Sequence, residues 1–184
     1  MRAIATDTVM LEPQVAAHAE EMFGVLSDPA IYAHENEPPA SIESLRARFA
    51  RLESRRSPRG DEQWLNWVVR EPAGALVGYV QATVRADGRA AIAYVLSSAH
   101  WGRGLARAAV EAMLGELAEH HGANCLTAVL KRGNLRSLRL LERLGFVAVQ
   151  PGRLQPQDIE PDEMLMQREL RADVPPASIS RPPR

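Results

Sequence analysis

A glycine-rich turn in the middle of the chain has the residue types needed to bind a phosphate group. The run Trp-Gly-Arg-Gly-Leu-Ala at positions 101–106 follows a predicted strand and precedes a predicted helix. Gly102 and Gly104 tolerate positive φ, which lets successive backbone amides converge on an anion at the positive end of the helix dipole. Arg103 and Arg107 would add cationic donors. This order of elements predicts a phosphate or pyrophosphate site that needs no net positive charge on the protein.

Three other interpretations of the turn compete with this one. A P-loop would end in Gly-Lys-Ser or Gly-Lys-Thr, which the turn lacks. A dinucleotide fold would place three spaced glycines directly after its first strand and an acidic residue about 20 residues further on, whereas this turn lies mid-chain behind several strands. The third interpretation is a tight strand-to-helix turn without a ligand, and it stays open as long as the motif stands alone.

A second motif reads Asn-Leu-Arg-Ser at 134–137, followed by Leu-Leu-Glu-Arg-Leu-Gly-Phe at 140–146. Together the two motifs resemble those of the GCN5-related N-acetyltransferases (the GNAT family), whose second motif commonly reads Asn-x-x-Ser and then Leu-Glu-Lys-x-Gly-Phe. Gly104 and Ala106 match the first motif of the family, and Trp101 stands at its Gln/Arg position. A tryptophan there resembles the branch of the ribosomal-protein N-terminal acetyltransferases.

The resemblance covers the chain from about Val9 to Leu170. It implies an α/β fold with a GNAT-like mixed sheet of about seven strands flanked by about four helices. It also implies acetyl-CoA as the co-substrate and an amine as the acceptor. The strand ending at Leu96 and the strand near Leu126 would splay apart, and pantetheine would bond to backbone near Leu96 and Ser98. With the chemistry of the glycine turn, the predicted cofactor residues are Leu96, Ser98, Trp101, Gly102, Arg103, Gly104, Leu105, Ala106, Arg107, Asn134 and Ser137.

The predicted reaction is direct attack of the amine on the thioester, which requires a polarised carbonyl, a neutral amine and a proton for the departing thiolate. A backbone N–H near Leu96 is expected to polarise the carbonyl. Many family members protonate the thiolate with a tyrosine, but Leu141 stands at that position. Ser137 resembles the serine proposed for this role in the ribosomal-protein branch, and its alternative role is a hydrogen bond near the helix N-terminus. For Asn134, an N-cap and a cofactor contact are both open.

The general base is not identified by the sequence. Relatives often carry glutamate where this chain has Ala91 and Ala93. In this family the loop between the first two helices borders the acceptor site, so the acidic residues and the histidine of that loop are candidates for the base. Two alternatives are open: the loop charges are only solvent-exposed, or a water relay accepts the proton. The alternative to an enzyme is a non-catalytic acyl-CoA binding module, because the tyrosine is missing and the base is unplaced. The candidates for the base are His34, Glu35 and Glu37, with Tyr94 as a positioning hydroxyl.

The hydrophobic pattern predicts elements that would position these motifs. A period of two over 64–69, 76–84 and 90–96 predicts an antiparallel meander, and apolar residues at helical spacing follow the glycine turn as far as His121. Further strands are expected at 8–12, 124–129, 146–149 and 163–170, and further helices from Pro13, after the cap Ser41 and over 135–144. Residues 173–184 are expected to be a Pro-rich flexible tail after a single domain at 1–172.

The composition is that of a soluble globular protein. The chain has 184 residues, 46% of them hydrophobic, with 22 Lys and Arg against 23 Asp and Glu. The net charge of -1 predicts no nucleic-acid partner, although the arginines of the second helix leave an RNA-binding alternative. No apolar run suits a membrane span or a signal peptide, so a cytoplasmic protein without a membrane partner is expected. Cys125 is expected in the core, no metal site is expected, and a homodimer is a possible assembly.

Overall fold

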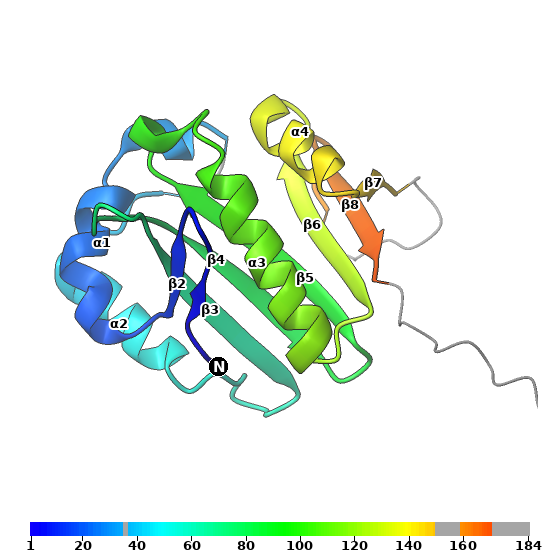
Figure 1. Cartoon of the computed structure of the whole chain (residues 1–184), viewed down its shortest axis with the longest axis horizontal. Helices are drawn as coiled ribbons and strands as arrows, with labels where there is room; N and C mark the ends of the chain where they lie inside the picture. Colours follow the sequence, from blue (N-terminus) through cyan, green and yellow to red (C-terminus); the bar gives the residue numbers. More distant parts are fainter. Residues whose placement is uncertain (35–36, 150–158, 171–184) are drawn as a thin grey trace, which may run out of the picture.

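The computed structural model describes residues 1–34, 37–149 and 159–170. Within these ranges one eight-stranded mixed sheet has the order β1-β2-β3-β4-β5-β6-β8-β7, with four α-helices packed on it (Figure 1). The predicted α/β class is confirmed. The strands are β1 (Ile4–Ala5), β2 (Met10–Pro13), β3 (Glu62–Arg70), β4 (Leu76–Arg85), β5 (Arg89–Leu96), β6 (Cys125–Lys131), β7 (Val147–Ala148) and β8 (Glu163–Glu169), and the helices are α1 (Ala19–Leu26), α2 (Ile42–Leu52), α3 (Leu105–His120) and α4 (Leu135–Arg143).

The N-terminal segment differs from the prediction in two ways. The sheet has one strand more than expected, the two-residue β1, which is too short to leave a periodic pattern in the sequence. The prediction of a helix from Pro13 is wrong, because Pro13 is the last residue of β2 and pairs with Trp67 of β3. The Gln14 N–H then donates to the Asn66 carbonyl at 2.9 Å, which keeps the chain extended past the proline. The helix α1 therefore begins only at Ala19.

The meander and the strand that follows it create a gap in the sheet. Strands β3, β4 and β5 are antiparallel neighbours, as predicted. Strand β5 pairs in parallel with β6 only where Arg89–Ala91 face Cys125–Thr127. Beyond that point β6 pairs with β8 alone. The two strands therefore splay apart toward their C-terminal ends, as the resemblance implied.

The helices cover both faces of the sheet. On one face lie α3 and α4, whose buried side chains Met113 and Leu141 belong to the larger core cluster together with Val80 of β4 (Figure 1). On the other face lie α1 and α2, whose Met22 and Phe49 pack in a second cluster with Val68 of β3. Apolar side chains that alternate along the strands thus pack against the apolar sides of the helices, and they form one apolar layer on each side of the sheet.

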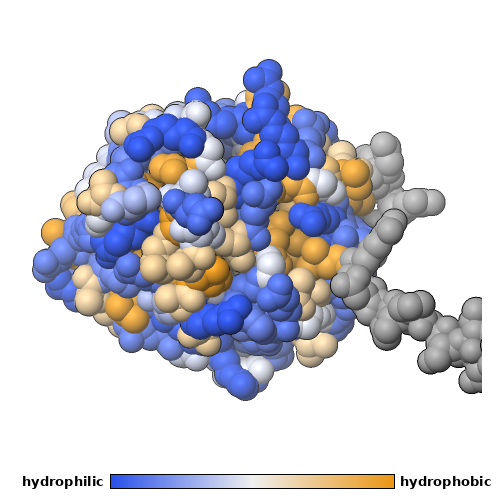
Figure 2. Space-filling model, viewed as in Figure 1, coloured by the Kyte–Doolittle hydropathy of each residue, from blue (hydrophilic) through white to orange (hydrophobic). Residues whose placement is uncertain are grey.

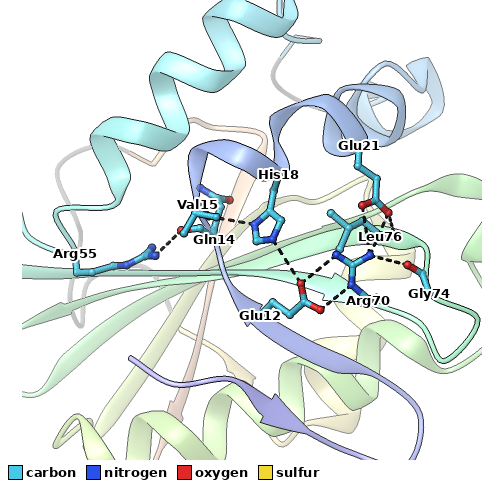
Figure 3. Close-up of polar contacts among 9 residues, drawn as sticks. All are labelled: Glu12, Gln14, Val15, His18, Glu21, Arg55, Arg70, Gly74 and Leu76. Atoms are coloured by element: carbon cyan, nitrogen blue, oxygen red, sulfur yellow. Dashed lines mark hydrogen bonds and ion pairs between the residues drawn. The ribbon is translucent and has the colours of Figure 1, made fainter.

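A network of ion pairs fixes α1 to the sheet (Figure 3). At the end of β3, Arg70 Nε donates to Glu12 Oε1 at 2.7 Å and Arg70 Nη1 lies 3.3 Å from Glu21 Oε1 of α1. Glu21 also accepts the backbone N–H of Leu76 at 2.6 Å, and His18 Nε2 lies 3.5 Å from Glu12 Oε2. The hydrogen bond from Arg70 is the main cause that lowers the pKa of the Glu12 carboxyl. The network joins α1 to β2, β3 and the start of β4.

The start of α2 is capped as the sequence predicted. Ser41 Oγ accepts the N–H of Ser44 at 3.1 Å, and Ser44 Oγ accepts the N–H of Ser41 at the same distance.

Seen from the side of α3, the surface is mostly hydrophilic, with apolar residues in scattered groups (Figure 2). In the described part of the chain, no helix combines the length and the apolar character that crossing a membrane requires. The expected tail at 173–184 lies outside the described residues.

Candidate functional site

The glycine turn forms the N-terminus of α3. Gly102 and Gly104 have φ values of 76° and 80°, in the left-handed region that favours glycine. A Cβ added at either position would meet no atom within 4 Å, so the backbone is open to a ligand there. Gly104 is the N-cap, and Leu105 points into the core. The first amides of α3 have no intrahelical partner, so the turn fits a pyrophosphate.

Acidic side chains hold the two arginines of the turn. Arg103 Nη2 lies 3.3 Å from Glu71 Oε2, and Arg107 Nε donates to Glu111 Oε1 at 2.9 Å. Glu71 also places Oε1 3.6 Å from Nε2 of the half-buried His100. Glu71 was not found from the sequence because it lies in the β3–β4 turn, 32 residues before Arg103. A bound phosphate would have to compete with these carboxylates for the arginines.

Trp101 links the glycine turn to β5 and to α4. Its indole Nε1 donates to the Leu96 carbonyl at 2.9 Å. The guanidinium of Arg136 lies 3.6 Å from the centre of the indole ring, which is a cation–π contact. Trp101 belongs to the first sequence motif and Arg136 to the second. The two motifs are therefore in contact at the open end of the β5–β6 gap.

The gap exposes backbone groups of β5. The Ser97 N–H donates to the Val77 carbonyl at 2.9 Å. Hydrogen bonding alternates along an antiparallel pair, so the main-chain groups of Leu96 and Tyr94 face away from β4 and toward β6. The pairing with β6 ends at Ala91. The Leu96 amide is therefore directed into the gap, which is the orientation that a donor to a thioester oxygen needs.

A pocket of about 330 Å³ passes through the sheet at this gap. Its walls come from both faces, because Leu141 belongs to the core cluster of α3 and α4 and Leu26 to that of α1 and α2. The pocket thus connects the two sides of the sheet. Of the predicted catalytic and cofactor residues, it brings together His34, Glu37, Tyr94, Asn134 and Ser137.

Tyr94 and Ser137 form a hydrogen-bonded pair in this pocket. Tyr94 Oη lies 2.6 Å from Ser137 Oγ and 3.3 Å from the Ser137 carbonyl oxygen. Burial raises the pKa of Tyr94 to about 12, so its hydroxyl stays protonated at neutral pH. Asn134 Oδ1 accepts the Ser137 N–H at 3.1 Å, which confirms the N-cap interpretation of Asn134. The buried side chain of Leu141 stands one helical turn further along α4.

Asp28 joins the acceptor side of the pocket to the end of β5. Its Oδ2 accepts the Ser98 N–H at 2.8 Å, and its Oδ1 accepts the Ala30 N–H at 3.0 Å. The hydrogen bonds from Ser98 lower the pKa of the Asp28 carboxyl. Any contact of Ser98 with a cofactor would thus use an atom other than this N–H. The sequence shows only a helix stop at Asp28-Pro29, because the partner of Asp28 lies 70 residues away.

The segment after α1 borders the pocket on the acceptor side. Tyr32 Oη donates to the Leu26 carbonyl at 2.7 Å. A Cβ built on Gly133 would lie 3.9 Å from the His34 ring, so this segment meets the turn before α4. Glu37 is exposed at the rim, and the candidate Glu35 lies outside the described residues. Over the ranges that the structure describes, no group of three His, Cys, Asp or Glu could hold a metal ion.

Comparison with known proteins identifies the fold. The sequence pattern of the family described as acetyltransferase (GNAT) domain matches residues 8–147. The ribosomal-protein-S5-alanine acetyltransferase from Vibrio fischeri is similar with a TM-score of 0.75 and 16% identity, over 91% of this chain and 96% of that chain. RimL, a ribosomal L7/L12 alpha-N-protein acetyltransferase in complex with coenzyme A, is similar with a TM-score of 0.75 and 15% identity, over 91% and 98%. The microcin C7 self immunity acetyltransferase MccE, in complex with acetyl-CoA and AMP, has a TM-score of 0.73 and 16% identity, over 90% and 94%. Among curated protein sequences no match is found.

Proposed function

Because the chain belongs to the GNAT acetyltransferase family, we propose that it transfers the acetyl group of acetyl-CoA to a primary amine by direct attack in a ternary complex. The observation that carries this proposal is the pocket that passes through the sheet at the β5–β6 gap. A thioester that enters from the face of α3 and α4 would meet an amine that arrives from the face of α1 and α2. No covalent enzyme intermediate is then needed.

The cofactor residues are proposed from the glycine turn outward. The amides that follow Gly104 would bind the pyrophosphate, and Arg103 and Arg107 would exchange their carboxylate partners for phosphate oxygens. The Leu96 amide would donate to the thioester oxygen and so stabilise the negative charge that develops on it. Bound acetyl-CoA supplies the activated acyl group. The open space at both turn glycines supports this arrangement.

The proton balance of the reaction assigns roles to the pocket hydroxyls. The amine nitrogen forms a bond to the carbonyl carbon and loses a proton, while the carbon–sulfur bond breaks and the sulfur gains one. We assign the donation to sulfur to Ser137, and Tyr94, whose hydroxyl lies 2.6 Å away, would restore the proton of Ser137 and regain its own proton from water in the pocket. Glu37 in the pocket wall would accept the proton of the amine, directly or through water, and Glu35 is the second candidate for this role.

Thiol release tests the proposal directly. Purified protein with acetyl-CoA and a panel of peptide and small-molecule amines should release coenzyme A only in the presence of an accepted amine. Calorimetry on the same samples measures cofactor binding separately. Binding of acetyl-CoA without release for every amine would instead support a non-catalytic acyl-CoA binding module.

A further inference from the structure

The main-chain groups at the end of β5 are engaged with one exception. Partners at 3.2 Å or less bind the Leu96 carbonyl and both the N–H and the carbonyl of Ser97 and of Ser98. The exception is the Leu96 N–H, which the alternation of hydrogen bonds along β5 directs away from β4 and into the gap. Among the main-chain groups of residues 96–98, all of which the structure describes, the one left for a ligand is therefore a donor.

Trp101 is the side chain that engages the Leu96 carbonyl. Its indole Nε1 donates to that oxygen at 2.9 Å. In the described sheet the oxygen has no strand partner, because it also faces the gap and the pairing of β5 with β6 ends at Ala91. Without the indole, Leu96 would direct an unengaged acceptor into the gap beside its N–H. Asp28 and Val77 fix the two residues that follow, so of these three partners only Trp101 acts on the residue that supplies the donor.

An unengaged acceptor at this position would oppose acyl transfer. The N–H and the carbonyl of one strand residue point to the same side, so a thioester oxygen bonded to the Leu96 N–H lies beside the Leu96 carbonyl oxygen. The two oxygens repel each other, and the repulsion grows as negative charge develops on the thioester oxygen in the transition state. Leu96 is only 5% exposed, so water screens this repulsion little. A hydrogen bond to the Leu96 carbonyl therefore stabilises the transition state more than the bound coenzyme, which raises kcat rather than affinity.

The indole is fixed by its surroundings. Its ring packs against the larger core cluster, and the guanidinium of Arg136 lies 3.6 Å from the ring centre. The backbone N–H of Trp101 donates to the Ser98 carbonyl at 3.2 Å. Arg136 also places a positive charge on the ring whose N–H is the donor. A donor that is fixed in this way needs no reorganisation during the reaction, which is the property that makes electrostatic stabilisation effective.

We propose that Trp101 is a positioning residue for acyl transfer, whose indole N–H binds the Leu96 carbonyl so that the Leu96 amide alone faces the thioester oxygen. This inference rests on the proposed acetyl transfer and deepens it by naming a residue that acts through the carbonyl-polarising amide. Trp101 is the first residue of the glycine-rich motif. In this role it serves the thioester end of the coenzyme, whereas the glycines that follow it serve the pyrophosphate.

Trp101→Phe tests the inference, because it keeps an aromatic ring for Arg136 and removes only the N–H donor. We expect kcat, measured by coenzyme A release, to fall about tenfold, the effect of losing one hydrogen bond in the transition state. The Kd of acetyl-CoA from calorimetry should change little. Trp64→Phe is the matched control, since it removes an indole bond to Glu62 Oε2 at 3.2 Å on β3, and it should behave as wild type.

A second readout follows the thioester carbonyl itself. Infrared difference spectra of bound acetyl-CoA, labelled with ¹³C at the thioester carbonyl, report the polarisation of that bond without an acceptor. In the wild type and in Trp64→Phe the stretch should lie below its frequency in free acetyl-CoA, and in Trp101→Phe it should move back toward that frequency. Arg136→Gln leaves the N–H in place, so it should lower kcat only about twofold.

The outcomes separate the inference from the proposed function. Wild-type kcat and an unchanged carbonyl stretch in Trp101→Phe would overturn the inference and leave the acetyltransferase proposal standing. A weaker Kd at unchanged kcat would contradict it as well, because Trp101 would then bind the coenzyme. A loss in Arg136→Gln as large as in Trp101→Phe would also count against it, since the ring contact would then carry the effect. A wild type that binds acetyl-CoA but releases no coenzyme A with any amine would overturn the proposed function, and the carbonyl stretch would still decide the inference.

Discussion

Removal of the Ser137 hydroxyl should slow the chemical step and leave cofactor binding intact. In Ser137→Ala the departing sulfur loses its proton donor, and general acid catalysis contributes about a hundredfold or more to such a step. We therefore expect kcat to fall about a hundredfold, with KM for acetyl-CoA little changed. The Asn134 cap of α4 uses the Ser137 backbone N–H, so the helix N-terminus should survive the substitution.

Tyr94→Phe should have a smaller effect, because Tyr94 acts through Ser137. It removes the 2.6 Å hydrogen bond, and such a bond contributes about 1 kcal/mol, which corresponds to roughly a fivefold to tenfold fall in kcat. The free energy of unfolding should fall by a similar amount, about 2–4 °C in Tm for a domain of this size. With a pKa of about 12, Tyr94 should add no titration to the rate profile between pH 6 and 9.

A double-mutant cycle of Ser137→Ala and Tyr94→Phe, with kcat measured by thiol release at saturating acetyl-CoA, gives the coupling energy between the two hydroxyls. The double variant should be no slower than Ser137→Ala. Ser54→Ala, which removes an exposed hydroxyl bonded to the Arg56 carbonyl outside the pocket, is the matched control and should behave as wild type. Wild-type kcat in Ser137→Ala, or rate losses that multiply in the double variant, would refute the relay.

Four further substitutions, one of them measured against pH, test the fold and the cofactor site. Gly104→Val should weaken acetyl-CoA binding at least tenfold in calorimetry, because the side chain would enter the phosphate approach of a residue with φ of 80°. Gly78→Ala should lower the free energy of unfolding in urea by about 2–3 kcal/mol, since the added Cβ would lie 2.0 Å from the Val95 carbonyl oxygen. Gly115→Ala is the matched control in α3, where the added Cβ has free space, and it should raise the free energy of unfolding by about 0.5–1 kcal/mol. In the folded state Arg70 lowers the pKa of the Glu12 carboxyl below its ordinary value of 4.5, so the ionised carboxylate stabilises the fold. This stabilisation is fully present above pH 4.5 and is lost as the pH falls through the lowered pKa. In Arg70→Met we therefore expect Tm to fall less steeply with decreasing pH in the acid range than in the wild type.

The elements that the sequence predicted well are those whose signal is local. Alternating residues identified β3, β4 and β5, and helical spacing identified α3 and its end near His121. The helix predicted from Pro13 failed because Pro13 also suits the end of a strand, and pairing with Trp67 decided between them. The strand β1 could not be found, since two residues are too few for a periodic pattern and they form a strand by pairing with β2.

In the candidate site, too, the features with a local signal were recognisable from the sequence, and the long-range contacts were not. Gly102 and Gly104 were recognisable because positive φ and an open helix N-terminus are local requirements. The contacts that join the parts of the site, such as Asp28 with Ser98, depend on which strands become neighbours.

A structure determined with acetyl-CoA bound is the most direct test of the account. We predict the pyrophosphate on the first backbone amides of α3, the pantetheine between β5 and β6, and the thioester oxygen beside the Leu96 N–H. A coenzyme bound anywhere else, or a protein that does not bind acetyl-CoA at millimolar concentration, would contradict it.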